Sequence, residues 1–588
     1  MVAANSWKNR STSGWLFPGH FPGYPVSVRT ETVRPPLHNQ GVLVALVPEA
    51  DGAGRWQKLH DDGTPAGPAM AASSLASAVA SLERAHRPRW VWADTTEVYP
   101  ALLRAGVRVD RCWDLHLTEA LLLGAEGRHR EPRELAAAVA RELGLPPPAD
   151  LGPRKKDVEL TLFEPEPVVL PGGTDPLTAL SLVFRAQQRN PALGLLIAAE
   201  SASALVAAEM THHGLPWRAD VHNAILEEML GPRTAPGVRP KVLQALADQI
   251  REAFGGKEVN PDAPASIVRA FAREGIDVPS ARRWVLKKID HPAVEPLLEY
   301  KERARLWVAH GWTWLDAWVK DGRFRPDYVV GGVVSGRWAS RGGAALQIPR
   351  LMRKAVVADE GWCLVAADAS QLEPRILAAL SGDQRLIEVC GDDDLYSALA
   401  ADSFKGERPR AKIAMLSAMY GGTSGEAGPL LAVLRKRFPQ AVGYVEAAAQ
   451  AGEQGRMVRT RLGRTSPAPS EAWRELTGGA DDSGEVSSSS RQAARNWGRF
   501  TRNFVVQGSA ADWTAALLAV LRNRLPLNAH LVFFQHDEVL VHCPREDADA
   551  VIEAIADAGR EATRLLFGDT AVRFPMNAVP VECYADAK

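Results

Sequence analysis

The sequence feature that most constrains the fold is a polar interruption inside an apolar run, LVFFQHDEVLVHC at residues 531–543. Apolar residues lead up to Gln535, His536, Asp537 and Glu538, and they resume directly afterwards. This pattern predicts two buried strands joined by a tight turn. A buried carboxylate without a partner is strongly unfavourable or remains protonated. The two adjacent carboxylates therefore indicate either an acidic hairpin turn or a site for a cation.

A second stretch, GWCLVAADASQLEPRIL at 361–377, has the same organisation. An apolar strand over 363–367 ends at Asp368, and a helix is expected to begin near Glu373. Taken singly, Asp368 and Asp537 are better explained as turn residues or helix caps. Together they predict a metal site, because neighbouring carboxylates repel each other unless a divalent cation holds them. Carboxylates that leave room for phosphate suit Mg²⁺, and two such ions support in-line phosphoryl transfer.

The segment ERPRAKIAMLSAMYGG at 407–422 predicts a helix, with Pro409 just inside its start. A stripe at four-residue spacing along it consists of Arg408, Lys412, Leu416 and Tyr420. Such a helix could bind a triphosphate near its N-terminus and a base near its other end. The alternative is an ordinary solvated basic helix start.

The segment RQAARNWGRFTRNFVVQGSAAD at 491–512 predicts a second cationic helix, which we expect to end at Gln507 because Gly508 and Ser509 follow. Its stripe consists of Arg491, Arg495, Arg499, Asn503 and Gln507, with Arg502 beside it. An ordinary exposed Arg-rich helix more often interleaves Glu, yet 491–511 contains no acidic residue. The stripe therefore favours a phosphate backbone and base edges as partners.

Composition limits the class of protein. The 588 residues carry a formal net charge of −1, which neither favours nor excludes nucleic acid. The five cysteines are scattered without a CxxC pair, which argues against a zinc site or a disulfide framework and fits a reducing compartment. No apolar run approaches the ~18 residues that span a bilayer, and the N-terminus lacks the apolar core of a signal peptide. We therefore expect a cytoplasmic protein without a membrane segment.

The chain divides into four parts by pattern. Strands are expected over 41–48, 89–94, 362–367 and 530–541, helices over 115–125, 195–210 and 292–319, and a flexible loop over 467–490. The parts are a poorly ordered lead-in over 1–40, an α/β domain over 41–190, a helical region over 191–330, and a mixed region over 331–588.

Three motifs resemble motifs A, B and C of family A DNA polymerases, in the family's order and spacing. They are DASQLEPR at 368–375, the Arg408, Lys412, Tyr420 and Gly421 pattern, and HDE at 536–538. SGRWAS at 335–340 and NFVVQGSAAD at 503–512 support the resemblance, which covers about residues 200–588. It implies an α+β multidomain fold with a right-hand polymerase domain: thumb at 191–330, palm and fingers at 331–588.

The resemblance implies template-directed addition of deoxynucleotides to a primer 3′-hydroxyl, with release of pyrophosphate, in replication or repair. The implied partners are primer–template DNA and dNTPs, and the implied cofactors are two Mg²⁺ ions, with Mn²⁺ as a substitute. It also implies a monomer that is cytoplasmic, nucleoid-associated and encoded by a bacterium or phage.

Residue roles carry over from the matching positions. Asp368 and Asp537 would hold the metals, and Glu538 would support the metal site or the primer end. Nucleotide-binding positions would be Arg408, Lys412, Leu416, Tyr420 and Glu373, with Lys412 also a proton donor to pyrophosphate and Glu373 excluding a 2′-hydroxyl. DNA-binding positions would be Arg337, Arg499, Asn503, Gln507 and His536.

Three positions depart from the family pattern. Leu416 and Ala369 stand where the family commonly has aromatic residues, and Pro374 replaces an aliphatic residue. Sugar discrimination and nucleotide stacking could therefore differ from the family, and turnover could be slow.

The part over 41–190 resembles the family's 3′–5′ exonuclease domain, which has an RNase H-like fold, through CWDLHLTEALLLG at 112–124. Its metal ligands do not carry over: VALVPE at 44–49 lacks the D-x-E motif, Val98 occupies an aspartate position, and Asp175 is the candidate for a third ligand. We therefore expect that proofreading is lost, and that there is no room upstream for a 5′-nuclease domain.

Three alternatives remain open. A single-subunit RNA polymerase shares the two aspartates and the Lys/Tyr helix, although Glu373 and Glu538 argue against it. A non-catalytic DNA-binding relative is disfavoured by the intact pair of aspartates. A working exonuclease would depend on Asp175.

Overall fold

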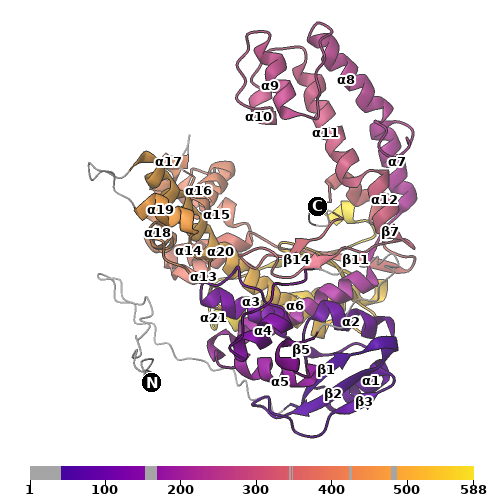
Figure 1. Cartoon of the computed structure of the whole chain (residues 1–588). Helices are drawn as coiled ribbons and strands as arrows, with labels where there is room; N and C mark the ends of the chain where they lie inside the picture. The colour runs from indigo at the N-terminus through magenta and orange to yellow at the C-terminus, as the bar shows by residue number, and fades with distance from the viewer. Residues whose placement is uncertain are drawn as a thin grey trace, which may run out of the picture. The chain divides into compact units, whose positions relative to one another are not determined.

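The structure is a computed structural model that describes residues 41–152, 169–343, 346, 348–391, 393–422, 427–478 and 487–587 (Figure 1). The lead-in expected over 1–40 lies outside these residues. The described residues belong to one compact unit by their contacts.

The N-terminal part is built on a five-stranded sheet. Its strands are β1 (Leu43–Pro48), β2 (Gly54–Leu59), β3 (Met70–Ala72), β4 (Arg89–Trp92) and β5 (Arg111–Asp114), in the order β3-β2-β1-β4-β5. Strands β1, β4 and β5 run parallel to one another. Strand β2 runs antiparallel to both of its neighbours, β1 and β3. Val44 and Leu46 face one apolar core, while Leu43 and Ala45 face another. Both faces of β1 are therefore covered, as in α/β domains.

Helices cover this sheet. They are α1 (Leu75–His86), α2 (Thr95–Arg104), α3 (Leu115–Ala125), α4 (Leu135–Glu142) and α5 (Pro176–Gln187). The strands expected over 41–48 and 89–94 and the helix over 115–125 are confirmed.

Helix α6 (Gly194–His213) joins the N-terminal sheet to the rest of the chain. Leu196 belongs to one core of the N-terminal part, Leu205 to the other, and Met210 to the core of the C-terminal part. A helix that is apolar all round is normally buried. By length and composition alone, Pro191–His213 and Ser488–Arg524 could each cross a membrane, but their apolar windows are 67% and 78% buried within the protein.

The next part is helical. Its helices are α7 (Ala219–Leu230), α8 (Lys241–Ala253), α9 (Pro264–Ala272), α10 (Arg283–Leu286), α11 (Val294–His310) and α12 (Trp312–Trp318). The single helix expected over 292–319 is wrong, because the chain leaves the helix at Gly311, where φ is −74° and ψ is −172°. Short strands accompany these helices. A three-stranded sheet has the order β6 (Leu215–Pro216), β8 (Arg323–Phe324) and β7 (Val319–Lys320), and β9 (Tyr328–Val329) pairs with β10 (Ala339–Ser340).

A four-stranded antiparallel sheet forms the centre of the C-terminal part (Figure 1). Its strands are β11 (Trp362–Ala369), β12 (His530–Gln535), β13 (Glu538–Pro544) and β14 (Met576–Val581), in the order β12-β13-β11-β14. The sequence predicted the first three but not β14, whose MNAVPV segment is short and interrupted by proline. Helix α21 (Ala548–Phe567) packs on the sheet with an apolar face.

Helices between β11 and β12 complete this part. They are α13 (Leu372–Ser381), α14 (Gln384–Val389), α15 (Leu395–Ser403), α16 (Arg408–Tyr420), α17 (Ala427–Arg437), α18 (Pro439–Glu453), α19 (Glu471–Gly478) and α20 (Ser488–Arg524). The loop expected over 467–490 is wrong for 471–478 and 488–490, which are helical. Trp473 packs on Trp497 and donates its Nε1–H to the Ala493 carbonyl at 3.1 Å. Residues 479–486 lie outside the described part.

Helix α20 does not end at Gln507 as predicted but continues through Gly508 for a total of 37 residues. Gly508 is required by close packing rather than by helix termination. A Cβ there would lie 2.5 Å from Cγ2 of Thr460.

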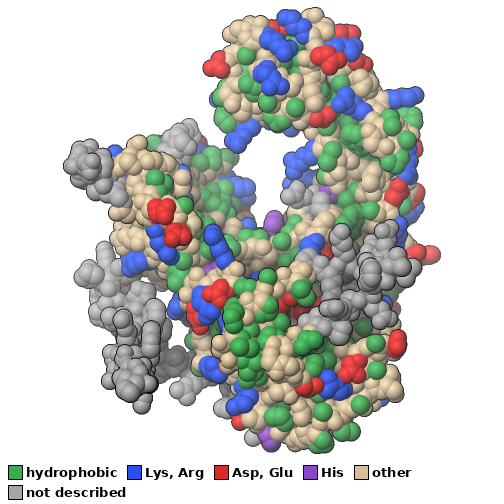
Figure 2. Space-filling view, in the orientation of Figure 1, with side chains coloured by type: hydrophobic (Ala, Val, Ile, Leu, Met, Phe, Trp, Pro, Cys, Tyr) green, Lys and Arg blue, Asp and Glu red, His purple; other side chains and the backbone are tan. Residues whose placement is uncertain are grey.

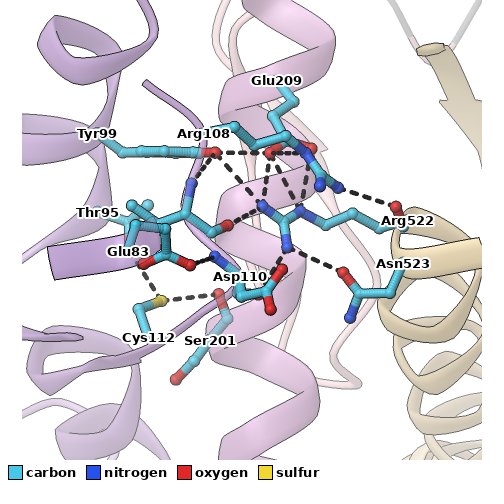
Figure 3. A network of polar contacts seen from close by, with 11 residues as sticks. Glu83, Thr95, Tyr99, Arg108, Asp110, Cys112, Ser201, Glu209, Arg522 and Asn523 are labelled. Carbon is cyan, nitrogen blue, oxygen red and sulfur yellow. Dashed lines mark hydrogen bonds and ion pairs between the residues drawn. The ribbon is translucent and has the colours of Figure 1, made fainter. Parts of the chain in front are cut away.

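A buried polar network joins the C-terminal end of α20 to the N-terminal part (Figure 3). Arg522 forms an ion pair with Glu209 of α6 at 2.6 Å and donates to the Asp110 carbonyl at 2.7 Å. Tyr99 donates its hydroxyl to the same glutamate at 2.6 Å, and Arg108 contacts it at 3.2 Å. This network fastens α2, α6 and α20 together.

Candidate active site

The register of the central sheet brings together carboxylates that lie about 170 residues apart in sequence. Asp368 on β11 is paired with Glu538 on β13. Gln535 is paired with Glu538 across a two-residue turn made of His536 and Asp537. The Ala369 amide donates to the Asp537 carbonyl at 3.1 Å, so the turn is attached to the end of β11.

The turn is rigid and partly enclosed. His536 has φ +59°, in the left-handed region that histidine tolerates better than most residues. Its side chain is exposed and lines one hollow together with Arg337, Trp338 and Phe534. Asp368 and Asp537 are half-buried.

Glu538 is buried and lies against a cation of the protein. Arg353 approaches its carboxylate at 3.6 Å and stacks over the Tyr584 ring at 4.2 Å. Because a buried carboxylate needs charge compensation, Arg353 is the cation placed to supply it to Glu538.

The donor set fits an ion that takes few protein ligands. Among the residues that the structure describes, no three His, Cys, Asp or Glu side chains converge as a closed metal cage. Mg²⁺ does not require one, since it is usually held by one or two carboxylates together with substrate phosphates and water. Asp368 and Asp537 supply oxygen ligands of this kind.

Helix α16 begins at Arg408 and ends at Tyr420, with Pro409 in its first turn, as predicted. Arg408 pairs with Asp394 at 2.8 Å, and this hydrogen bonding lowers the pKa of Asp394 to about 2. Arg408 and the exposed Lys412 both lie over the Tyr396 ring, at 5.6 and 5.9 Å. The first two turns of the helix thus present two cations next to an aromatic face.

Glu373 joins three segments that the sequence had assigned to substrate binding. Tyr420 donates its hydroxyl to one carboxylate oxygen at 2.6 Å, and Arg337 forms an ion pair with the other. Burial and the neighbouring carboxylate raise the pKa of Tyr420, so the hydroxyl keeps its proton. Both oxygens of Glu373 are therefore fixed in direction.

The three departures from the family pattern are accommodated differently. Ala369 is 2% exposed, and Leu416 packs at the edge of the core. Pro374 lies in the first turn of α13, where its missing N–H is tolerated.

The stripe on α20 lies partly at the surface. Arg491, Arg495 and Arg499 are exposed, while Asn503 and Gln507 are half-buried. Gln507 accepts a hydrogen bond from Ser335 at 2.9 Å, and Oδ1 of Asn503 has no hydrogen-bond partner among the described residues.

Arg502, which the sequence placed beside this stripe, points away from the surface. It is 8% exposed and donates to the Ala418 carbonyl of α16 at 3.0 Å. Its function is to hold α16 against α20.

Sequence reasoning missed Arg353, Asp394 and Tyr396. Their contacts depend on tertiary packing, although Asp394 and Tyr396 belong to a segment, DDLYSALA, that precedes the cationic helix. Figure 2 shows basic and acidic side chains interspersed over one face, in keeping with the net charge of −1.

The candidate carboxylates of the N-terminal sheet have structural contacts. Asp175 caps α5 through the Leu177 amide at 3.0 Å and pairs with Arg55 at 2.7 Å. Val98, at the family's aspartate position, is 4% exposed within α2.

Comparison with known proteins identifies relatives. A family model described as DNA polymerase family A matches residues 240–579, more than half of the chain. The chain is 30% identical over 302 residues to "DNA polymerase I, thermostable" of Thermus filiformis, which covers 45% of this chain and 34% of that protein. It is 27% identical over 359 residues to DNA polymerase I of Mycobacterium tuberculosis; the match covers 53% of this chain and 38% of that protein. The chain thus spans about a third of the length of these relatives.

A solved structure shares the fold. It is described as the POL domain of Pol1 from M. smegmatis in complex with DNA primer-template and dNTP. The TM-score is 0.68 at 20% identity, over 93% of this chain and 96% of that one.

Proposed function

Because this chain belongs to DNA polymerase family A, we propose that it is a template-directed DNA polymerase. It would add deoxynucleoside monophosphates from dNTPs to a primer 3′-hydroxyl and release pyrophosphate. The observation that carries this proposal is the strand register that brings Asp368, Asp537 and Glu538 together at one end of the central sheet.

Asp368 and Asp537 would hold two Mg²⁺ ions, for which Mn²⁺ could substitute. Such ions activate the attacking hydroxyl and stabilise the leaving oxygen of an in-line displacement. Glu538, which lies against Arg353, would support the metal site or the primer end. His536 on the turn would contact the primer terminus.

The start of α16 would bind the incoming triphosphate. A helix N-terminus favours anions, and Arg408 and Lys412 add two cations to it. Lys412, which is exposed, would donate a proton to the departing pyrophosphate.

Glu373 would select the sugar. Tyr420 and Arg337 hold its carboxylate in place, so it cannot swing away from a 2′-hydroxyl. Leu416 offers less stacking surface than an aromatic residue, which would weaken nucleotide binding and slow turnover.

Arg337, Arg499, Asn503 and Gln507 would contact primer–template DNA. Exposed arginines suit phosphates, and the amides suit base edges. We further propose a monomeric, cytoplasmic, nucleoid-associated enzyme of bacterial or phage origin without a membrane segment, acting in replication or repair.

Primer extension on a gapped template tests the proposal. Asp368→Ala and Asp537→Ala should each lower the extension rate by about a thousandfold or more, since the metals contribute several kcal/mol. Asp569→Ala, an exposed carboxylate outside the site, is the matched control. Chelation of divalent ions should abolish extension, and Mg²⁺ should restore it.

Three results would contradict it. Equal incorporation of rNTPs and dNTPs would indicate an RNA polymerase. No extension by the wild type, with DNA binding unaffected by Asp537→Ala, would indicate a non-catalytic DNA-binding protein. Undiminished extension by Asp368→Ala would exclude the proposed metal site.

We propose in addition that the N-terminal part is a 3′–5′ exonuclease-like domain that has lost proofreading. The engagement of Asp175 with Arg55 and the burial of Val98 support this. Degradation of labelled single-stranded DNA by the wild type but not by Asp175→Ala would overturn it.

A further inference from the structure

A second buried ionic cluster lies outside the carboxylates of the sheet and is centred on Arg464. The guanidinium is 7% exposed and forms an ion pair with Glu200 of α6. Its Nε–H donates to Asp512 of α20 at 3.2 Å, and the two carboxylates are 3% and 0% exposed. Thr460 donates its hydroxyl to Asp512 at 2.5 Å. Three segments far apart in sequence are therefore held by one arginine.

The guanidinium also supports the backbone of a tight turn. Gly336 has φ +87°, and a Cβ added there would lie 2.5 Å from Cζ of Arg464. The turn is closed by the Gly336 amide, which donates to the Val333 carbonyl at 2.7 Å, and by the Val333 amide, which donates to Arg337 at 3.0 Å. Arg464 therefore limits how far this turn can move toward the protein interior.

The residues on either side of Gly336 both bear on the expected DNA contacts. Arg337 is itself such a contact, and Ser335 supports another, Gln507. Ser335 donates its hydroxyl to Gln507 at 2.9 Å. Arg337 forms the ion pair with Glu373. A displacement of the turn would therefore misplace Gln507 and Arg337 together.

Helix α20 is fixed at the same place. The Arg461 amide donates to Ser509 at 3.0 Å, and Thr460 packs against Gly508. Gln507, Gly508 and Ser509 are consecutive, so the segment that carries Arg464 also sets the position of Gln507.

We propose that Arg464 is a positioning residue for DNA recognition: the Glu200–Arg464–Asp512 cluster holds the 333–337 turn and the middle of α20 so that Arg337 and Gln507 engage the primer–template together. The inference depends on the proposed DNA polymerase function. It extends the determinants of DNA binding to a buried arginine and to α6, which itself packs on the N-terminal sheet.

Arg464→Lys is the main test, because lysine keeps the charge but cannot contact both carboxylates as a planar fork. Arg522→Lys is the matched control, since it alters another buried arginine that bridges α6 and α20. Equilibrium binding of labelled primer–template is measured for both, with melting temperatures. We expect Arg464→Lys to raise Kd by about tenfold, from partial loss of two hydrogen-bonding contacts, and Arg522→Lys to leave Kd unchanged.

Steady-state kinetics separate positioning from general damage. Arg464→Lys should raise KM for primer–template while kcat at saturating DNA stays within about threefold of the wild type. When Arg337 is already replaced by Ala, Arg464→Lys should have a much smaller effect on Kd. The reason is that the effects of two residues that act through one another on binding free energy are not additive. Full additivity, or equal effects of the two lysine variants, would overturn the proposal.

Two glycine substitutions, compared with each other, test the proposal even if Arg464→Lys does not fold. Gly336→Ala introduces the clash with Arg464, whereas Gly322→Ala introduces a similar left-handed strain at φ +69° with no atom within 4 Å. Only Gly336→Ala should raise Kd, and an unchanged Kd would overturn the proposal. Binding needs no catalysis, so absence of primer extension by the wild type would count against the proposed function alone.

Discussion

Helix α6 carries two buried glutamates that meet arginines from the C-terminal part, and their surroundings differ. Arg464, the partner of Glu200, lies beneath the turn that carries Arg337. Arg522, the partner of Glu209, donates instead to backbone carbonyls of the N-terminal part (Figure 3). Similar ion pairs therefore have different surroundings: the first lies next to the turn that carries Arg337, which we propose contacts DNA, and the second attaches the N-terminal part.

The largest effect is expected from removing the charge of Arg522. Arg522→Met leaves Glu209 buried with only the half-exposed Arg108 as a cation. Breaking a buried pair in this way lowers the free energy of unfolding by about 3–5 kcal/mol. Thermal melting measures the loss. If the DNA Kd of the folded protein also rose, the distinction between the two arginines would fail.

Tyr99→Phe should have the next largest effect. The hydroxyl donates to Glu209 at 2.6 Å and accepts from the Val109 amide at 3.3 Å, and the ring is fully buried. Leaving these groups unsatisfied should lower the free energy of unfolding by about 1–2 kcal/mol. Denaturant unfolding checks this value. A neutral result would mean that Arg522 alone satisfies the glutamate.

The stability contributed by Glu209, in the Arg522 cluster, and by Asp512, in the Arg464 cluster, should change with pH in opposite directions. Burial raises the pKa of Glu209, but the charges of Arg522 and Arg108 outweigh burial and hold the pKa below its ordinary value of 4.5. Its contribution to stability is therefore present above pH 4.5 and is lost as the pH falls through the lowered pKa. Burial raises the pKa of Asp512 above its ordinary 3.8, and this exceeds the opposing effect of Arg464. Its contribution is present below pH 3.8 and is lost as the pH rises.

Melting temperatures of Glu209→Gln and Asp512→Asn, measured from about pH 7 to about pH 3, check these signs. The advantage of the wild type over Glu209→Gln should shrink on acidification. Relative to Asp512→Asn, the wild type should become less stable as the pH rises. Parallel curves for the two variants would contradict the difference between the clusters.

Arg108→Met should have the smallest effect. Its side chain is 49% exposed, so its pairing with Glu209 is weakened by solvent. We expect a loss below about 1 kcal/mol. A melting temperature of Arg108→Met as low as that of Arg522→Met would show that the exposure of each arginine does not determine how much it stabilises the protein.

The sequence predicted local structure and motifs better than tertiary contacts. The carboxylates and the cationic stripes were found because alternation and four-residue spacing are local patterns. The proximity of Asp368 to Asp537 was inferred from chemistry and resemblance, whereas the register that pairs Asp368 with Glu538 was not predicted, since no local signal sets a register between strands 170 residues apart. Gly508 misled the prediction of a helix end, because its role depends on Thr460 from another segment.

The same limit explains which site residues were missed or misplaced. Arg502 was placed beside the cationic stripe by its position in sequence, but its side chain is buried and donates to the Ala418 carbonyl. Glu200 and Arg464 are separated by 264 residues, and a buried pair of this kind has no signature in either segment alone. Charged residues in otherwise apolar stretches, such as Glu200 and Glu209 in α6, were the signal available.

The scattering of the central strands along the chain also governs when they can assemble. Strand β11 leaves the ribosome long before β12 and β13, and at about 5–20 residues per second the delay is about 10–30 s. During that time an apolar strand has no neighbour in its sheet and is open to mispairing. The helices over 372–524, which rely on local contacts, can fold first and shield it. Formation of the carboxylate site is therefore among the last events of synthesis, because Asp368 meets Asp537 and Glu538 only after the C-terminal strands arrive.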